Sequence, residues 1–174
     1  MNFELFDSLT PDEAREHLQG FLDTERVAME IMIPAAGHAG ISMDYSMASL
    51  PSVLKWILSG VQIIRVPVPA TEPDWIREFH KDGFIDFPAE SKYLILRAAY
   101  YLGECFVRAH NSLIWTIGDP DYVEKNMPVV AGFQFDKEMA PMMVCENVFS
   151  GIRGRGAPES NIDIMIHSWV GLMP

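Results

Sequence analysis

The fold is decided by residues 90–110, which read ESKYLILRAAYYLGECFVRAH. An α-helix advances roughly 100° per residue, and at that spacing the apolar side chains cover most of the circumference. The main face comprises Leu94, Ile95, Ala98, Ala99, Leu102, Cys105, Phe106 and Ala109, and Tyr93, Leu96, Tyr100 and Val107 extend it. A helix with so little polar surface must be enclosed on most sides. We therefore predict a largely buried helix that organises the rest of the chain.

One polar stripe remains on this helix. Its members, which project within about 80° of one another, are Arg97, Tyr101, Glu104 and Arg108. A carboxylate on an otherwise apolar helix must be paired or solvated. Two interpretations stay open: a salt-bridged polar seam that holds the helix against a sheet, and a pocket that Trp115 completes. Neighbouring arginines lower the pKa of a carboxylate, so we expect no catalytic role for Glu104 and assign no catalytic residue.

Gly103 lies elsewhere on the same helix. A glycine inside a helix costs about 1 kcal/mol relative to alanine. Its presence predicts that another backbone approaches the helix closely at this point.

A second helix is predicted near the start of the chain. Residues 10–13 read TPDE, which combines an N-cap threonine, a proline at the first helical position and a capping-box glutamate. We expect this helix to run to about Ile33, where Pro34 ends it. Its acidic residues fall in a narrow stripe opposite the apolar face and are candidates for partner binding: Asp12, Glu16, Asp23 and Glu30.

The remaining segments suggest helices and short strands. Before the central helix we expect a helix capped by Ser46 or Ser49 that runs through Leu58, a strand or a helix continuation at 61–66, a short helix at 72–80 with Trp75, Ile76 and Phe79 buried, and a loop at 83–88. After it we expect antiparallel strands at 113–117 and 128–135, a helix or strand at 142–152, a flexible loop at 151–158, and a helix or strand at 161–172. The predicted fold is α+β: N-terminal helices and a central buried helix packed on a small antiparallel sheet, in a single domain, residues 1–174.

Composition narrows the functional classes. The 174 residues are 49% hydrophobic and carry a formal net charge of -11. This charge disfavours nucleic-acid binding and favours a basic protein partner, although acidity can also serve solubility alone. No stretch approaches the ~20 apolar residues of a membrane-spanning helix, and the first seven residues lack a secretory signal pattern. With Cys105 and Cys145 in no metal or redox spacing, we expect a soluble cytoplasmic protein with free thiols.

Motifs for common chemistries are missing from the sequence. The five histidines are dispersed, which predicts no metal site, and we expect no cofactor because nucleotide-binding and nucleophile signatures are absent. Residues 151–156, GIRGRG, are the one glycine-rich basic segment. Its amides and arginines could cradle an anion, but a mobile loop has the same composition.

Two short motifs carry a resemblance. Residues 44–50 read DYSMASL, and residues 101–104 read YLGE, followed by Arg108 and Trp115. This pattern resembles an uncharacterised group of small bacterial proteins, some of which look like immunity proteins of toxin systems. The chain departs from the group at Asn111 and Ser112, where a glycine-rich turn is expected. The resemblance implies a bacterial protein and brings no catalytic residue with it.

Three functional hypotheses follow from these observations. The first is a protein-binding module, with an immunity protein that neutralises a basic toxin domain as its specific form. The second is a domain or enzyme that binds a small anionic ligand in a pocket around Tyr101, Glu104 and Arg108. The third is a structural subunit with a large apolar interface. The sequence leaves the oligomeric state open.

Overall fold

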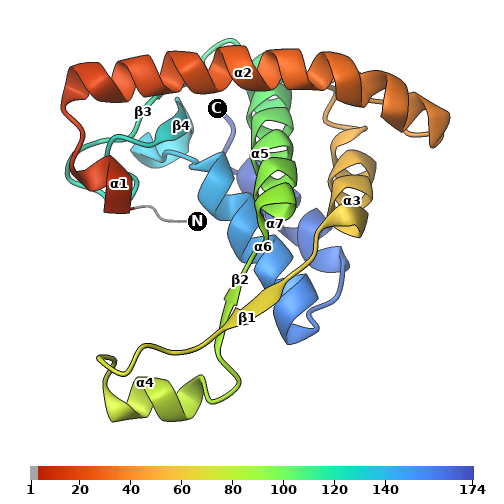
Figure 1. Cartoon of the computed structure of the whole chain (residues 1–174). Helices are drawn as coiled ribbons and strands as arrows, with labels where there is room; N and C mark the ends of the chain where they lie inside the picture. Colours follow the sequence, from red (N-terminus) through yellow and green to blue (C-terminus); the bar gives the residue numbers. More distant parts are fainter. Residues whose placement is uncertain (1–3) are drawn as a thin grey trace.

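The central helix is present as predicted. The structure is a computed structural model that describes residues 4–174, with side chains from Phe6 onward. Helix α5 (Ala89–Ala109) runs through the middle of the molecule, with the other large elements around it (Figure 1). Its fully buried side chains include Ile95, Tyr101 and Phe106. The expectation that the chain begins without a signal sequence rests in part on residues 1–3, which lie outside the described residues.

The other elements comprise short and long helices and two strand pairs. The helices are α1 (Glu4–Asp7), α2 (Pro11–His38), α3 (Leu50–Gly60), α4 (Asp74–Phe79), the 3-10 turn η1 (Gln134–Asp136), α6 (Pro141–Arg155) and α7 (Ser160–Val170). The strands are β1 (Ile64–Val66), β2 (Phe84–Asp86), β3 (Ile114–Ile117) and β4 (Pro128–Ala131).

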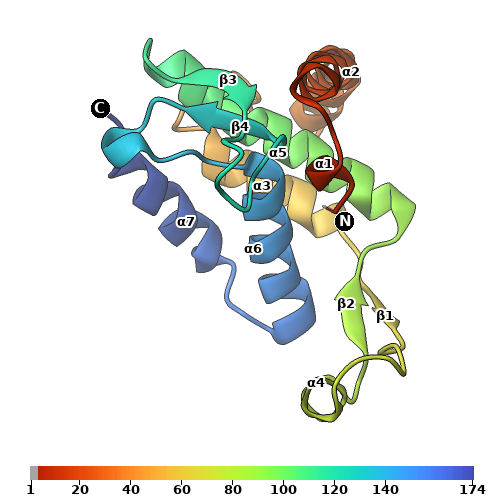
Figure 2. The ribbon, with the colours of Figure 1, turned by 90° about the vertical axis from the view of Figure 1, so that its left-hand side faces the viewer.

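The fold class is α+β, as predicted. Strands β3 and β4 pair antiparallel, with Trp115 opposite Val130, and this small sheet packs against α5. Helices α3 and α6 pack on other sides of α5, and α2 crosses over α5 near its middle, where Phe21 packs on Tyr100 (Figures 1 and 2). The buried apolar side chains of all these elements form one hydrophobic cluster.

Helix α2 is longer than predicted. Its start has the predicted capping box between Thr10 and Glu13, but the expected end near Ile33 is wrong, because the helix continues through Pro34 to His38. A proline inside a helix removes one hydrogen bond and crowds the preceding turn. Burial of Met32 and of Ala36, on either side of Pro34, offsets that cost by holding both turns against the core.

A projecting arm contradicts two predictions. Strands β1 and β2 pair antiparallel and carry α4 at their far end, away from the body of the molecule (Figures 1 and 2). The loop expected at 83–88 therefore contains a strand. The predicted burial of Trp75 and Phe79 is also wrong, since they are 70% and 80% exposed. Their spacing suits an apolar helix face, but the hairpin carries that face away from the core.

The C-terminal region is helical. Residues 142–152 lie in α6 and residues 161–170 in α7, which resolves both open alternatives. The flexible loop expected from residue 151 is wrong for its first part, because α6 extends to Arg155 and ends at Gly156, whose φ of 71° is the left-handed conformation of a helix C-cap. Among the described residues, the structure contains no helix that is long and apolar enough to span a membrane.

Candidate functional site: the polar seam of α5

Trp115 joins α5 to the sheet. The indole Nε1 of Trp115, in β3, donates a hydrogen bond of 3.0 Å to Oε1 of Glu104. Gly103 makes this possible, because a Cβ at position 103 would lie well inside van der Waals contact with the Trp115 ring. The close approach predicted at Gly103 is therefore real, but it is made by a side chain and not by a backbone. The tryptophan also stacks on Tyr100.

The other oxygen of Glu104 is paired on the helix itself. Arg108 Nε donates to Glu104 Oε2 at 3.0 Å, and its guanidinium carbon lies 3.8 Å from the centroid of the Tyr45 ring. Tyr45 in turn stacks on Tyr101, with ring centroids 4.9 Å apart. We call Tyr45, Tyr101, Glu104, Arg108 and Trp115 the α5 seam.

Tyr101 is fully buried, and its hydroxyl is used twice. It accepts a hydrogen bond from the backbone N–H of Tyr45 at 3.0 Å and lies 2.8 Å from the Ser49 hydroxyl. Burial raises the pKa of Tyr101 to about 12, so the phenol stays protonated under ordinary conditions. These bonds hold Tyr45 in a left-handed conformation, with a φ of 60°, that non-glycine residues rarely adopt.

The turn at residues 44–46 positions Tyr45. Ser46 N donates to Asp44 Oδ1 at 2.9 Å, the turn expected of Asp and Ser in this order. Hydrogen bonds from the Ser46 side chain and backbone, together with one from Ser49, lower the pKa of Asp44 to about 2. Both motifs of the resemblance thus meet at the α5 seam, although 56 residues separate Tyr45 from Tyr101.

Arg97 lies apart from the seam. It was predicted in the same stripe, but the interaction that the structure shows for it is an electrostatic attraction to Glu25 of α2. Glu25 is buried, and it is not among the site residues predicted from the sequence. The helical spacing of the sequence predicts this burial, because Glu25 lies four residues after Phe21 and four before Met29, in the centre of the apolar face of α2.

The four predicted partner-binding acids are exposed along α2. Two of them form ion pairs with neighbours on the helix, Asp12 with Arg15 and Glu30 with Arg26, and Asp23 accepts a hydrogen bond from Gln19. Two apolar residues, Val27 and Ile31, lie beside them and are 51% and 75% exposed. The outer face of α2, defined by Asp23, Val27, Glu30 and Ile31, is thus both acidic and apolar.

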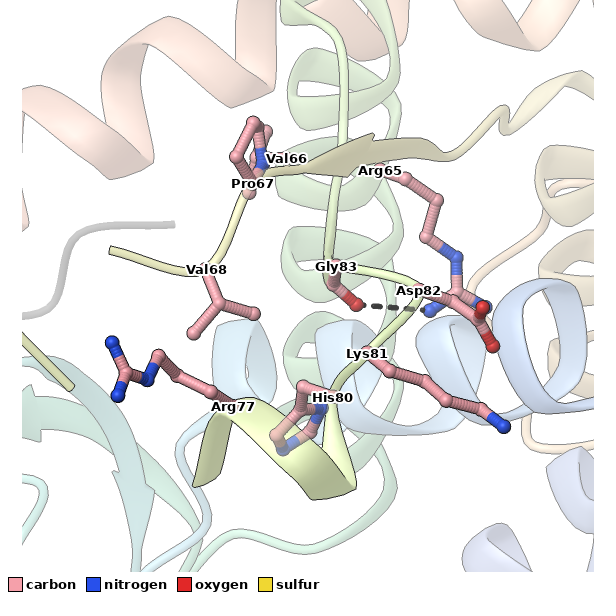
Figure 3. Close-up of a pocket in the computed structure, with 9 residues that line it drawn as sticks. All are labelled: Arg65, Val66, Pro67, Val68, Arg77, His80, Lys81, Asp82 and Gly83. Carbon is pink, nitrogen blue, oxygen red and sulfur yellow. Dashed lines mark hydrogen bonds between the residues drawn. The ribbon is translucent and has the colours of Figure 1, made fainter. Parts of the chain in front are cut away.

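Two arginines of one candidate anion site already have partners within the chain. A cavity of about 440 Å³ lies between the β1–β2 hairpin and α4 (Figure 3). Its Arg65 donates to the backbone oxygens of Gly83 and Gly154, and Arg77 pairs with Asp74.

The basic segment at 151–156 forms the end of α6 instead of an anion cradle. Its Arg153 donates from two nitrogens to Leu58 O. Within residues 4–174, the structure groups no three or more His, Cys, Asp and Glu side chains in a way that could hold a metal ion.

The fold and the seam define an α+β protein in which a polar joint ties the central helix to a sheet and to the α2–α3 connection. A comparison with models of known protein families gives no match, and comparisons with curated proteins and with solved structures give no significant match either.

Proposed function

We propose that this chain is a protein-binding module that binds a basic protein through the outer face of α2. The observation that carries the proposal is the exposure of Val27 and Ile31, one helical turn apart, with Asp23 and Glu30 beside them. Such a surface suits a basic partner, whose apolar side chains can cover the aliphatic residues and whose cations can pair with the carboxylates.

Charge supports the choice of a basic partner. Helix α2 contains six carboxylates and two arginines, within a chain of formal net charge -11. The exposed ion pairs on α2 contribute little stability, so a partner's cations can replace the arginines at small cost. Long-range attraction would also accelerate association at low ionic strength.

The geometry gives less support to an anionic ligand at the seam. Both carboxylate oxygens of Glu104 accept hydrogen bonds, Arg108 is stacked on Tyr45, and the Tyr101 hydroxyl is fully engaged. A ligand that used Glu104 or the Tyr101 hydroxyl would have to break these contacts before making its own. We therefore interpret the seam as the structure that holds α5 in place.

The specific form of the proposal is an immunity protein that neutralises a basic toxin domain in a bacterial cytoplasm. The resemblance of residues 44–50 and 101–104 to proteins of toxin systems supports this form. The two buried cysteines, Cys105 and Cys145, are free thiols, which is consistent with a reducing compartment.

The charge of α2 is tested by a matched pair of variants. Immobilised wild-type chain is exposed to extracts of the organism that encodes it, and bound proteins are identified and their affinities measured. Asp23→Lys/Glu30→Lys should weaken binding of a basic partner by about tenfold or more. Glu78→Lys/Glu159→Lys, which makes the same charge change elsewhere, should have no effect. Equal binding by both variants, or no basic partner, would show the proposal to be wrong.

Two further measurements test the apolar contact and the immunity role separately. Val27→Ser/Ile31→Ser should weaken the complex and leave the salt dependence of association unchanged, because it removes apolar contact without altering charge. For the immunity role, cells producing a toxin domain encoded beside the gene should survive with the wild-type chain and die with Asp23→Lys/Glu30→Lys. If the cells died with the wild-type chain as well as with the variant, the chain would have no immunity role against that toxin domain.

A further inference from the structure

A second cavity lies on the inner side of α2. It has a volume of about 320 Å³ and is bordered by α2, α5 and the start of α6. Phe21, Leu96 and Met142 supply apolar walls, and Glu25 and His17 supply ionisable groups. Its volume is at the lower end of the range of roughly 300–1,000 Å³ for small-molecule sites.

Glu25 is the unusual member of this lining. Glu25 is only 5% exposed. Its Oε2 is buried and has no hydrogen-bond partner among the described residues. A buried carboxylate oxygen without a partner is costly, and native proteins seldom leave one unless a ligand or a function uses it.

Arg97 does not supply the missing partner. It attracts Glu25 electrostatically and so lowers its pKa, but burial acts more strongly and raises it. In its ionised form, the Glu25 carboxylate therefore carries a negative charge that its surroundings compensate poorly. A cation with its own hydrogen-bond donors would compensate both the charge and the unpaired oxygen.

The apolar wall beside Glu25 is held by its neighbours. The Phe21 ring packs edge-to-face on Trp115 and on Tyr100, with centroids 5.7 Å and 6.2 Å apart. These contacts link the cavity to the α5 seam and fix the wall. By contrast, the terminal torsion of a glutamate is soft, so either oxygen of Glu25 can turn to meet a donor.

We propose that this cavity binds an alkylammonium group, with the charged nitrogen on the carboxylate of Glu25 and the alkyl stem against Phe21, Leu96 and Met142. A free small amine and a lysine side chain of a protein share this chemistry. The inference is independent of the function proposed above, because Glu25 and the acids of the outer face lie on opposite sides of α2.

The test titrates the whole chain with n-butylammonium, with n-butanol and with N-acetyl-lysine methylamide, using calorimetry and NMR shifts. Butylammonium should bind saturably, and butanol, which lacks the charge, should bind about tenfold more weakly or worse. Lysine amide binding as tightly as butylammonium would point to a protein side chain as the natural ligand. Binding of butylammonium without the lysine amide would point to a free amine.

Glu25→Gln keeps the shape of the side chain and removes its charge. It should reduce butylammonium affinity at least about tenfold, whereas Asp23→Asn, an exposed acid of the same helix, should leave it unchanged. A circular dichroism melt of each variant confirms that it is folded. Absence of saturable butylammonium binding, or equal binding by wild type and Glu25→Gln, would overturn the proposal. Neither result bears on capture of a basic partner by Asp23 and Glu30.

Discussion

Gly103 is the position at which the packing of α5 against β3 leaves no room for a side chain. Glu104 holds the Trp115 ring through Nε1, and that ring occupies the space that a Cβ at position 103 would need. Gly103→Ala should therefore destabilise the protein by about 1–3 kcal/mol, the usual cost of overpacking. Urea denaturation measures it.

Gly20→Ala is the matched control. Gly20 also lies inside a helix, but a Cβ there would meet no atom within 4 Å. Alanine should raise stability by up to about 1 kcal/mol through helix propensity alone. If Gly103→Ala were as stable as Gly20→Ala, the Trp115 ring would have to be free to move.

The Tyr101 hydroxyl is the second critical group in the seam. Tyr101→Phe removes it and leaves the part-buried N–H of Tyr45 without its acceptor, so stability should fall by about 1–3 kcal/mol. Tyr122→Phe, at a side chain that is 60% exposed, should change nothing measurable. Equal stability of the two variants would contradict the hydrogen-bond geometry. Thermal and urea denaturation provide the comparison.

Glu25 makes stability depend on pH. Burial raises its pKa above the ordinary value of 4.5, so the folded chain holds this proton more tightly than the unfolded chain. Stability should fall as pH rises from about 4.5 through the folded pKa. Arg97 and His17 are the other charged or ionisable side chains that face Glu25.

Glu25→Gln isolates the carboxylate in that pH dependence. The variant should be more stable than wild type above the folded pKa of Glu25 and should lack this part of the pH dependence. Asp23→Asn should retain it. Urea denaturation over a series of pH values measures the difference, and parallel curves for wild type and Glu25→Gln would contradict the prediction.

At the scale of elements, α2 continues through a proline because its neighbours are buried. Pro34 is exposed and cannot donate to the carbonyl four residues earlier. Pro34→Ala should restore that bond and raise stability by about 1–3 kcal/mol. Ala35→Gly, at the next exposed position, should lower it by about 1 kcal/mol. Loss of stability in Pro34→Ala would show that the proline shapes the packing of Met32 and Ala36.

At the scale of the whole molecule, the arm and the body differ in how they are held. Helix α4 has no buried residue, whereas α5 is buried along most of its length. Backbone amides of residues 67–82 should therefore exchange hydrogen at least about 100-fold faster than those of residues 98–106. Hydrogen exchange followed by mass spectrometry measures this, and equal protection would mean that the arm opens only with the core.

Local periodicity was sufficient to predict several elements. The burial of α5, the capping box of α2 and the β3–β4 pair depend on residues within a few positions of one another, which is the range over which helix and strand patterns act. The prediction of burial was wrong where the local pattern did not determine what surrounds the helix in the folded chain. Trp75 and Phe79 have helical spacing, yet the hairpin places them in solvent.

In the candidate sites, too, local sequence determined some features and tertiary packing determined others. The sequence alone determined that Tyr101, Glu104 and Arg108 share one face of a helix, because helix geometry requires it. Only the tertiary structure decided their partners, since Tyr45 and Trp115 come from other segments of the chain, and it also separated Arg97 from the seam. Residues 90–110, from which the fold was predicted, also depend on tertiary structure for their partners. Their apolar surface required neighbours, and long-range packing determined which side chains those neighbours would bring, including the buried carboxylate of Glu25.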